Sequence, residues 1–326
     1  MAAESIAETP QPGGTGRKHA SVHHTGEPSL LRRLASRPGS LFSLIGVGFF
    51  LLLALVGPFL APHDPAGLVG DSLAAPSGEH WMGTDSLGRD VFSRFLHGSQ
   101  ISIIIGFGAV ACALALGTLL GMLAGMWAGS RVDSLIMRLL DVVLSFPLLV
   151  LVPVVTGILS ERDLGIGPLE ISNEVLVAIA IGVVLVPVFA RIARASVLAE
   201  MREDYILAVK SFGGRTRDIL LRNLLPNIAA PLVVQAAFAL AMAVTVEAAV
   251  SFLGFGVRPP GASWGTLLNE ASKQLTLGGW WLVVFPSIAI ALFVLVFNLL
   301  GDQLRDELDP RAKTTKRRTR SDSEEQ

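Results

Sequence analysis

The sequence of 326 residues has little charge, few aromatic residues and almost no cysteine. Asp, Glu, Lys and Arg make up only 16% of it, whereas a soluble globular domain has about a quarter. Because 51% of the residues are hydrophobic, a membrane protein is favoured over a soluble one. The single cysteine, Cys112, excludes an intrachain disulfide and a thiolate metal cluster.

The sequence also lacks the residue patterns of several kinds of active site. None of the five lysines follows a glycine, so there is no P-loop and we predict that the chain does not bind ATP. All six histidines lie outside the apolar stretches, which leaves no Ser/His pair for hydrolysis inside a membrane. We therefore predict no catalytic residue, no bound metal or cofactor, and no nucleic-acid partner.

Six apolar stretches are present, and a helix needs about 20 such residues to cross a bilayer. They predict an all-α, polytopic membrane domain over 41–301. The polar segments 1–40 and 302–326 are predicted to be tails, the first of them disordered. The six predicted spans are 41–61, 98–130, 142–160, 175–190, 227–255 and 278–301.

The distribution of positive charge predicts the orientation of these spans. With the N-terminus in the cytoplasm, 21 of the 26 Lys and Arg residues fall on the cytoplasmic side. Both termini and the loop 196–226 are then cytoplasmic, and the loops 62–99 and 257–277 are external.

Small residues recur every fourth position in the second span, at Gly117, Gly121 and Gly125. This spacing lets two helices approach closely in lipid. The partner helix could belong to another subunit or to this chain, and the pattern alone does not distinguish the two.

The cytoplasmic loop 196–226 has more pattern than a simple connection needs. Tyr205, Ile206, Val209 and Phe212 recur at helical spacing and predict one apolar face. Gly213 and Gly214 then predict a helix end with positive φ. Thr216 is predicted to cap a second short helix, which Pro226 ends. These two amphipathic helices could dock into a partner or lie flat on the lipid interface.

The loop resembles the coupling loop of bacterial ABC importer permeases, whose pattern is E-A-A, three residues, G, nine residues, I-x-L-P. Ala208, Gly213 and the pair Leu225–Pro226 match it, while Leu207, Val209 and Asn223 depart from it. Three further segments resemble the peptide/nickel branch of that family. They are "HWMGTDSLGRDVFSRFLHGSQIS" (80–102), "EAAVSFLGFGVRPPGASWGTLL" (247–268) and "FPSIAIALFVLVFNLLGDQLRDELDPR" (285–311).

This resemblance implies a C-type permease subunit with the type I ABC importer fold in the bacterial inner membrane. It implies a second, B-type permease, two cytoplasmic ATPase subunits that use ATP and Mg, and an extracytoplasmic binding protein as partners. The loop would couple the spans to an ATPase through Tyr205, Ile206, Ala208, Val209, Phe212, Gly213, Gly214, Leu225 and Pro226. The cargo would be a dipeptide or oligopeptide, with nickel as the alternative, and an ion-coupled carrier is a third, less favoured class.

Charged and aromatic residues near the span ends give further hypotheses. Glu247 lies inside a span, where it could line the path or pair with an external arginine such as Arg89 or Arg258. Asp141 is expected at the cytoplasmic interface near Arg138. Contact with the binding protein or the second permease is expected from an external group of Asp85, Arg89, Asp90, Arg94 and Trp264. Trp264, Trp280 and Trp281 would also fit an external aromatic belt.

Overall fold

The computed structural model describes residues 38–161 and 172–308, and within these ranges the regular structure is helical apart from one isolated β-bridge. This agrees with the all-α prediction. The elements are α2 (Pro38–Val56), η1 (Gly57–Leu60), α3 (Val91–Met126), α4 (Arg131–Ser145), α5 (Leu148–Glu161), α6 (Asn173–Glu200), α7 (Asp204–Ser211), α8 (Thr216–Asp218), η2 (Ile219–Leu224), α9 (Leu225–Phe252), α10 (Trp264–Ser272), η3 (Leu275–Leu277) and α11 (Trp281–Leu308).

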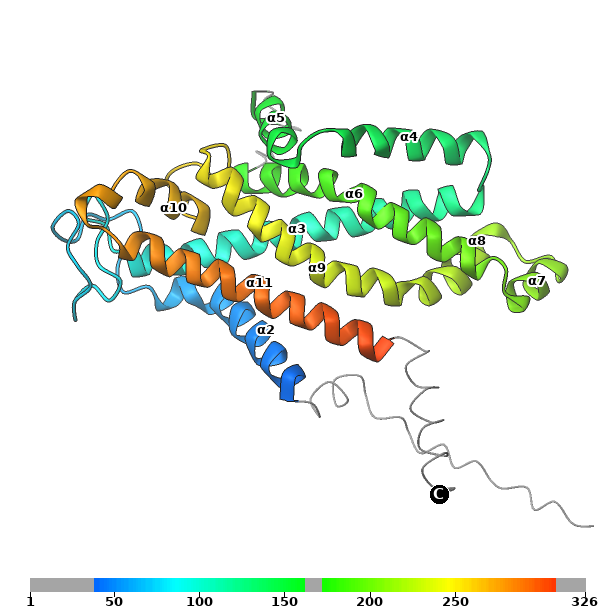
Figure 1. The fold of residues 1–326 in the computed structure, drawn as a ribbon, viewed down its shortest axis with the longest axis horizontal. Helices are drawn as coiled ribbons and strands as arrows, with labels where there is room; N and C mark the ends of the chain where they lie inside the picture. Colours follow the sequence, from blue (N-terminus) through cyan, green and yellow to red (C-terminus); the bar gives the residue numbers. More distant parts are fainter. Residues whose placement is uncertain (1–37, 162–171, 309–326) are drawn as a thin grey trace, which may run out of the picture.

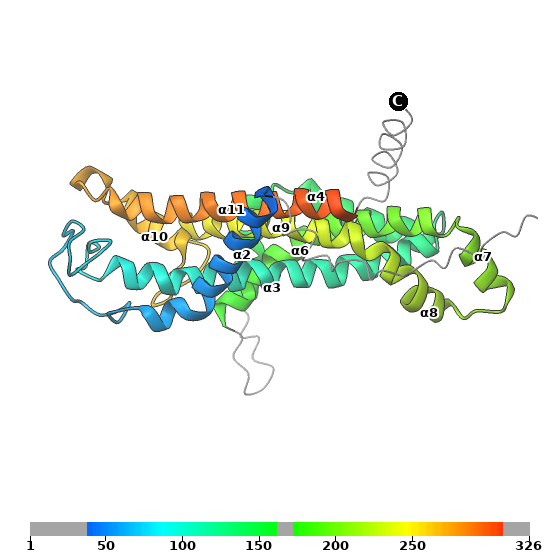
Figure 2. The ribbon, with the colours of Figure 1, turned by 90° about the horizontal axis from the view of Figure 1, so that it is seen from below.

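The long helices α3, α6, α9 and α11 form an elongated bundle, as Figures 1 and 2 show from two directions. Helix α2 packs against α11 and α3 on one side of it. The loop that precedes α3 lies with α10 at one end of the bundle, while α7 and α8 project from the other end (Figure 1). The two ends therefore carry different structures, which is what a directional membrane protein requires.

Five helices in the described ranges are long and apolar enough to cross a membrane, and a sixth crossing exists only if α4 and α5 count together. The predicted continuous span 142–160 is wrong, because the chain bends by 101° between α4 and α5. The break falls at Phe146, whose backbone is extended (φ −91°, ψ 137°) since it precedes Pro147. Helix α4 then lies beside α6, and α5 turns away from the direction of α4 while still packing against α6 (Figure 1).

Several predicted boundaries also shift. Helix α6 runs ten residues beyond the predicted span end at 190, and α3 begins at Val91 rather than at 98. Residues 302–308 belong to α11 and not to a tail. The rest of the predicted C-terminal tail, and the N-terminal tail up to residue 37, lie outside the described residues.

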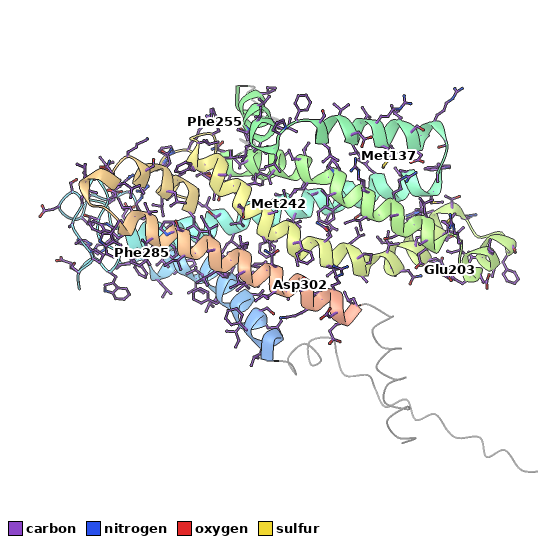
Figure 3. All side chains as sticks on the ribbon, in the orientation of Figure 1. Met137, Glu203, Met242, Phe255, Phe285 and Asp302 are labelled. Carbon is purple, nitrogen blue, oxygen red and sulfur yellow. The ribbon has the colours of Figure 1, made fainter. Side chains whose placement is uncertain are left out.

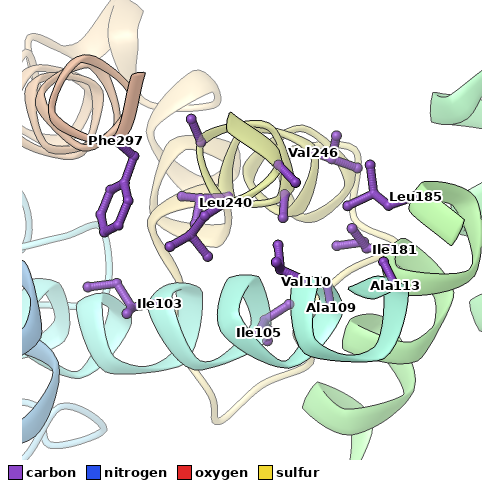
Figure 4. Packing of buried hydrophobic residues seen from close by; sticks show 14 of the residues in the cluster. Ile103, Ile105, Ala109, Val110, Ala113, Ile181, Leu185, Leu240, Val246 and Phe297 are labelled. Atoms are coloured by element: carbon purple, nitrogen blue, oxygen red, sulfur yellow. The ribbon is translucent and has the colours of Figure 1, made fainter. Parts of the chain in front are cut away.

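The core forms where α3 packs against α6 and α9. Figure 4 shows Val110 of α3, Ile181 of α6 and Leu240 of α9 converging on one apolar interior. The glycine stripe of α3 faces α6: a Cβ added at Gly121 would lie 2.3 Å from the carbonyl oxygen of Ala190. Such a distance leaves no space for a methyl group, so these glycines serve packing within the chain and not an intersubunit contact.

Replacing Gly121 by Ala is expected to destabilise the protein by about 1–3 kcal/mol, because backbone of α6 must move to accept the methyl group. Gly48→Ala is the matched control, since a Cβ there meets nothing within 4 Å and the same gain in helix propensity applies. The measurement is the thermal midpoint of each purified variant in detergent. Equal midpoints for the two variants would contradict close α3–α6 packing.

Candidate coupling site and external face

Helix α7 ends at Ser211, and the residues that follow it, Phe212, Gly213 and Gly214, form a corner in the chain. Gly213 has φ +76°, as predicted, a left-handed conformation that glycine adopts without strain. The N–H of Gly214 donates to the carbonyl oxygen of Val209 at 2.9 Å, which is the long bond of a Schellman motif. A Cβ on Gly214 would lie 2.5 Å from a methyl carbon of Val209, so this position also has no room for a side chain. Both glycines are therefore required by the local geometry.

The face that α7 exposes differs from the predicted one. Ile206 is completely buried in the core, and Tyr205 and Val209 are partly buried against it. The prediction that Ile206 belongs to an exposed docking face is wrong, because this side of α7 packs back onto the bundle. Phe212, in contrast, is 92% exposed at the tip of the corner. The rest of the exposed apolar surface here consists of Leu207, Ala208, Leu221 and Leu225.

Tyr205 holds α7 to the helices on either side of it. Its hydroxyl donates to Glu200 at the end of α6 and accepts from the side-chain amide of Asn227 in α9 at 2.7 Å. Burial, together with the hydrogen bond to Glu200, raises the pKa of Tyr205, so the phenol stays protonated as a donor. These two hydrogen bonds tie α7 to α6 and α9. The sequence placed Tyr205 in a docking face and gave no signal for this role.

The chain after the corner is one continuous helical path. Thr216 does not cap it: α8 starts at Thr216, one residue earlier than the cap prediction requires, so Arg215 occupies the cap position and makes no side-chain capping bond. Pro226 does not end a separate helix either. Thr216–Phe252 is one continuous helical segment, and Pro226 lies where the π-helix η2 passes into α9, at the start of the predicted fifth span. The corner therefore leads directly into a span.

At the opposite end, four charged residues form an ionic cluster in which Asp85 and Arg94 are buried and Arg89 and Glu270 are partly exposed. Arg94 is 2% exposed and donates to Asp85 at 2.7 Å and to Glu270 of α10 at 2.9 Å. Arg89 donates to the same two carboxylates at 2.7 and 2.9 Å. The prediction that Asp85, Arg89 and Arg94 form an outer contact surface is wrong, since their charges are used to fasten the loop before α3 to α10.

Asp90 and Trp264 are likewise structural rather than external contacts. Asp90 caps α3, accepting from the backbone N–H and the hydroxyl of Ser93 at 2.8 and 2.7 Å. Trp264 is completely buried and donates from its indole N–H to Ser99 at 3.1 Å. An external aromatic belt is wrong for Trp264 and also for Trp281, which is 5% exposed, whereas Trp280 is 54% exposed.

Glu247 is completely buried near the same end, within α9. One carboxylate oxygen accepts from the hydroxyl of Ser251 at 2.7 Å, and the other has no hydrogen-bond partner in the described part of the chain. The predicted pairing with Arg89 is wrong, because that guanidinium is bound by Asp85 and Glu270. The structure therefore gives Glu247 a hydroxyl partner in place of a cation.

Two ion pairs join α4 to α6. Arg191 pairs with Asp141 at 2.5 Å, and both side chains are more than half exposed, while Arg138 lies three residues before Asp141 in the same helix α4. Arg194 makes a bidentate pair with Asp133 at 2.7 and 2.8 Å, a link for which the sequence gave no signal. These pairs fix α4 beside α6 at the end that carries α7.

Two apolar grooves open on the face formed by α9 and α11. One of about 420 Å³ lies between α5, α9 and α11, and includes Met242, Thr245 and Asn298. The other, of about 410 Å³, lies nearer α7 and includes Gln235, Phe238 and Arg305. Figure 3 shows Met242 on this part of α9. Both grooves are open at the surface, so neither encloses a path within residues 38–161 and 172–308.

The fold and its two ends define a multi-span helical membrane permease. Residues 117–314 match the family described as "Binding-protein-dependent transport system inner membrane component". Residues 29–76 match the "N-terminal TM domain of oligopeptide transport permease C". Since the first match covers more than half of the sequence, the chain belongs to the family of inner membrane components of binding-protein-dependent transport systems.

Relatives from several bacteria cover most of the chain. The di/tripeptide transport system permease protein DppC of Pseudomonas aeruginosa is 39% identical over 86% of this chain and 90% of its own. The dipeptide permeases DppC of Bacillus subtilis and Escherichia coli are 36% and 39% identical, over 86% and 84% of this chain and 85% and 90% of their own. An inward-facing MetNI methionine ABC transporter structure is similar in fold, with a TM-score of 0.52 at 17% identity, over 66% of this chain and 96% of that one.

Proposed function

We propose that this chain is the C-type permease subunit of an ATP-driven importer of dipeptides or oligopeptides. The observation that carries the proposal is the exposed corner at Phe212 and Gly213. The helix before this corner is hydrogen-bonded to α6 and α9 through Tyr205, so a partner that moves the corner would also move these two spans. The partners are a second permease, two ATPase subunits that use ATP and Mg, and an extracytoplasmic binding protein. This subunit itself performs no catalysis.

The open grooves on α9 and α11 support a path shared with the second permease. A membrane path must be closed to lipid around its circumference, and in the described part of the chain these grooves are walled on one side only. Their lining is apolar with isolated polar groups such as Thr245 and Asn298, which suits passage of varied side chains without tight binding. A second subunit facing α9 and α11 would complete the wall.

The peptide cargo is proposed from the similarity to the three named peptide permeases. The test is uptake of a labelled dipeptide into proteoliposomes that contain the complete transporter, with ATP inside and the binding protein outside. The expected result is dipeptide accumulation that requires ATP and this chain. Accumulation of Ni²⁺ but not of peptide would assign the nickel alternative, and uptake driven by an ion gradient without ATPase subunits would refute the proposed class.

The orientation gives a separate prediction. Reporter fusions after Ser72 and Arg258 are expected to report an external position, and those after Arg131 and Gly214 a cytoplasmic one, because of the positive-charge asymmetry. The structure places the loop before α3 with α10 at one end and α7 at the other (Figure 1). A cytoplasmic signal after Ser72 would contradict this orientation.

A further inference from the structure

Three potential metal ligands converge in the external loop, at a place that the coupling and transport roles do not use. His63, His80 and Asp90 each offer one ligand atom, and these atoms all lie within 4.8 Å of one another. His80 and Asp90 are buried, while the His63 side chain is 30% exposed. The ligand atoms therefore lie in an enclosed place, and part of the His63 side chain reaches the surface.

Each of the three positions is fixed by the backbone around it. The backbone N–H of His63 donates to the hydroxyl of Ser93 at 3.1 Å, and that of His80 donates to Ser77 at 3.1 Å. Gly70 leaves the space that the His80 ring fills, since a Cβ there would lie 2.9 Å from Nε2. Asp90 is held as the cap of α3. A ligand set that is fixed in advance loses little conformational entropy when a cation enters.

The spacing of the ligand atoms suits a small tetrahedral cation. His80 Nδ1 is 3.0 Å from one carboxylate oxygen of Asp90, and His63 Nδ1 is 3.8 Å from the other. Zinc bonds of 2.0–2.1 Å in a tetrahedron place neighbouring ligand atoms about 3.3 Å apart. One ligand atom from each residue lies within 4.8 Å of the other two, so shifts of roughly 1 Å would bring the three atoms to this spacing.

A purely structural role explains only part of the arrangement. The helix cap is complete with Ser93, and the bond from His80 to Asp90 needs no third residue. His63 Nδ1, however, is a buried ring nitrogen with no hydrogen-bond partner among the described residues, and it faces the carboxylate. A buried polar atom without a partner destabilises the folded state. A cation between the three residues gives this nitrogen a partner.

We propose that His63, His80 and Asp90 bind one divalent cation of the zinc type on the external side of the chain. Imidazole and carboxylate ligands suit this class of cation, and because zinc takes four ligands a water molecule would supply the fourth. The cation would link the start of the first external loop, its middle and the first turn of α3. It would thereby stiffen the loop that also carries Asp85 and Arg89 of the ionic cluster.

The test uses the complete transporter, purified through a tag that contains no histidine. The predicted tail could chelate metal on its own, so His19, His23 and His24 are replaced by Ala in every sample. CoCl₂ is added as a spectroscopic probe, followed by ZnCl₂. The expected results are visible d–d absorption that saturates at one Co²⁺ per chain, its loss when Zn²⁺ is added, and a higher thermal midpoint with Zn²⁺.

His63→Ala is the decisive variant, and His63→Gln is a second one in case the smaller side chain impairs folding. Both are expected to lose the Co²⁺ absorption and the Zn²⁺-dependent midpoint shift. The affinity should fall by at least the ~10–100-fold that loss of an outer-shell partner causes at metal sites. His97→Ala is the matched control, since His97 lies in the same helix as Ser93 but outside the cluster. The proposal would be overturned if the transporter with an unchanged His63 showed no Co²⁺ absorption, or if the Co²⁺ absorption persisted in both His63 variants.

Discussion

Replacing Gly213 by Val is expected to abolish substrate uptake while the chain still inserts into the membrane at normal levels. Gly213 has φ +76°, and a β-branched residue in this conformation is strained by about 1–3 kcal/mol. A Cβ there meets nothing within 4 Å, so the effect comes from the backbone and not from a clash. Relief of the strain changes the angle between α7 and α8 and moves Phe212 away from the position that a partner must meet.

Gly213→Asn is the matched control, because asparagine tolerates the left-handed conformation better than other residues with a side chain. The measurement is uptake together with ATP hydrolysis by the complete transporter, at equal amounts of each variant. We expect Val to remove uptake and substrate-stimulated hydrolysis, and Asn to retain much of both. Normal uptake by the Val variant would show that the corner is only a connection between two helices.

Replacing Arg94 by Met is expected to lower the stability of the protein by about 3 kcal/mol. Removing one partner of a buried ion pair typically costs 3–5 kcal/mol, because the remaining charge is left in an apolar environment. The loss of stability should lie at the lower end of this range, since Arg89 still contacts both Asp85 and Glu270. The link between α10 and the loop before α3 is weakened, so this end of the bundle should open first.

Arg191→Met provides the comparison for Arg94→Met. Arg191 also pairs with an aspartate, but both side chains are more than half exposed, and such pairs contribute only about 0–1 kcal/mol. The measurement is the thermal midpoint of the two variants in detergent, with hydrogen exchange of 62–90 as a local readout. A similar small effect for both variants would mean that the ionic cluster does not hold together the end of the bundle that carries α10.

The sequence predicted the helical class and the positions of most spans because long apolar stretches have few alternatives in a bilayer. It failed at 142–160, where composition alone shows an apolar segment. The bend there depends on one residue, Phe146, which takes an extended backbone before Pro147. Composition measures how apolar a segment is, whereas the direction of the chain depends on single backbone angles.

The site predictions were correct for local backbone properties and wrong for contacts between distant parts of the chain. Gly213 was predicted correctly because a positive φ is a local property that a pair of glycines reveals. Ile206, Arg94 and Trp264 were assigned to exposed surfaces but are buried, since their contacts come from elements distant in the sequence. Arg94 meets Glu270 across 176 positions, and no local pattern encodes such a pair. Helical periodicity shows which residues share a face, but not whether that face meets protein or solvent.

The central claim is that work done by the ATPase subunits enters this chain at the corner formed by Phe212 and Gly213. The most direct test replaces Phe212 with the photoreactive aromatic residue benzoylphenylalanine and irradiates the assembled transporter. Phe59 is the control position, since it is 86% exposed and lies in η1, directly after α2. A crosslink from position 212 to an ATPase subunit, with none from position 59, is the predicted result. Crosslinks from position 212 to lipid alone would contradict the claim.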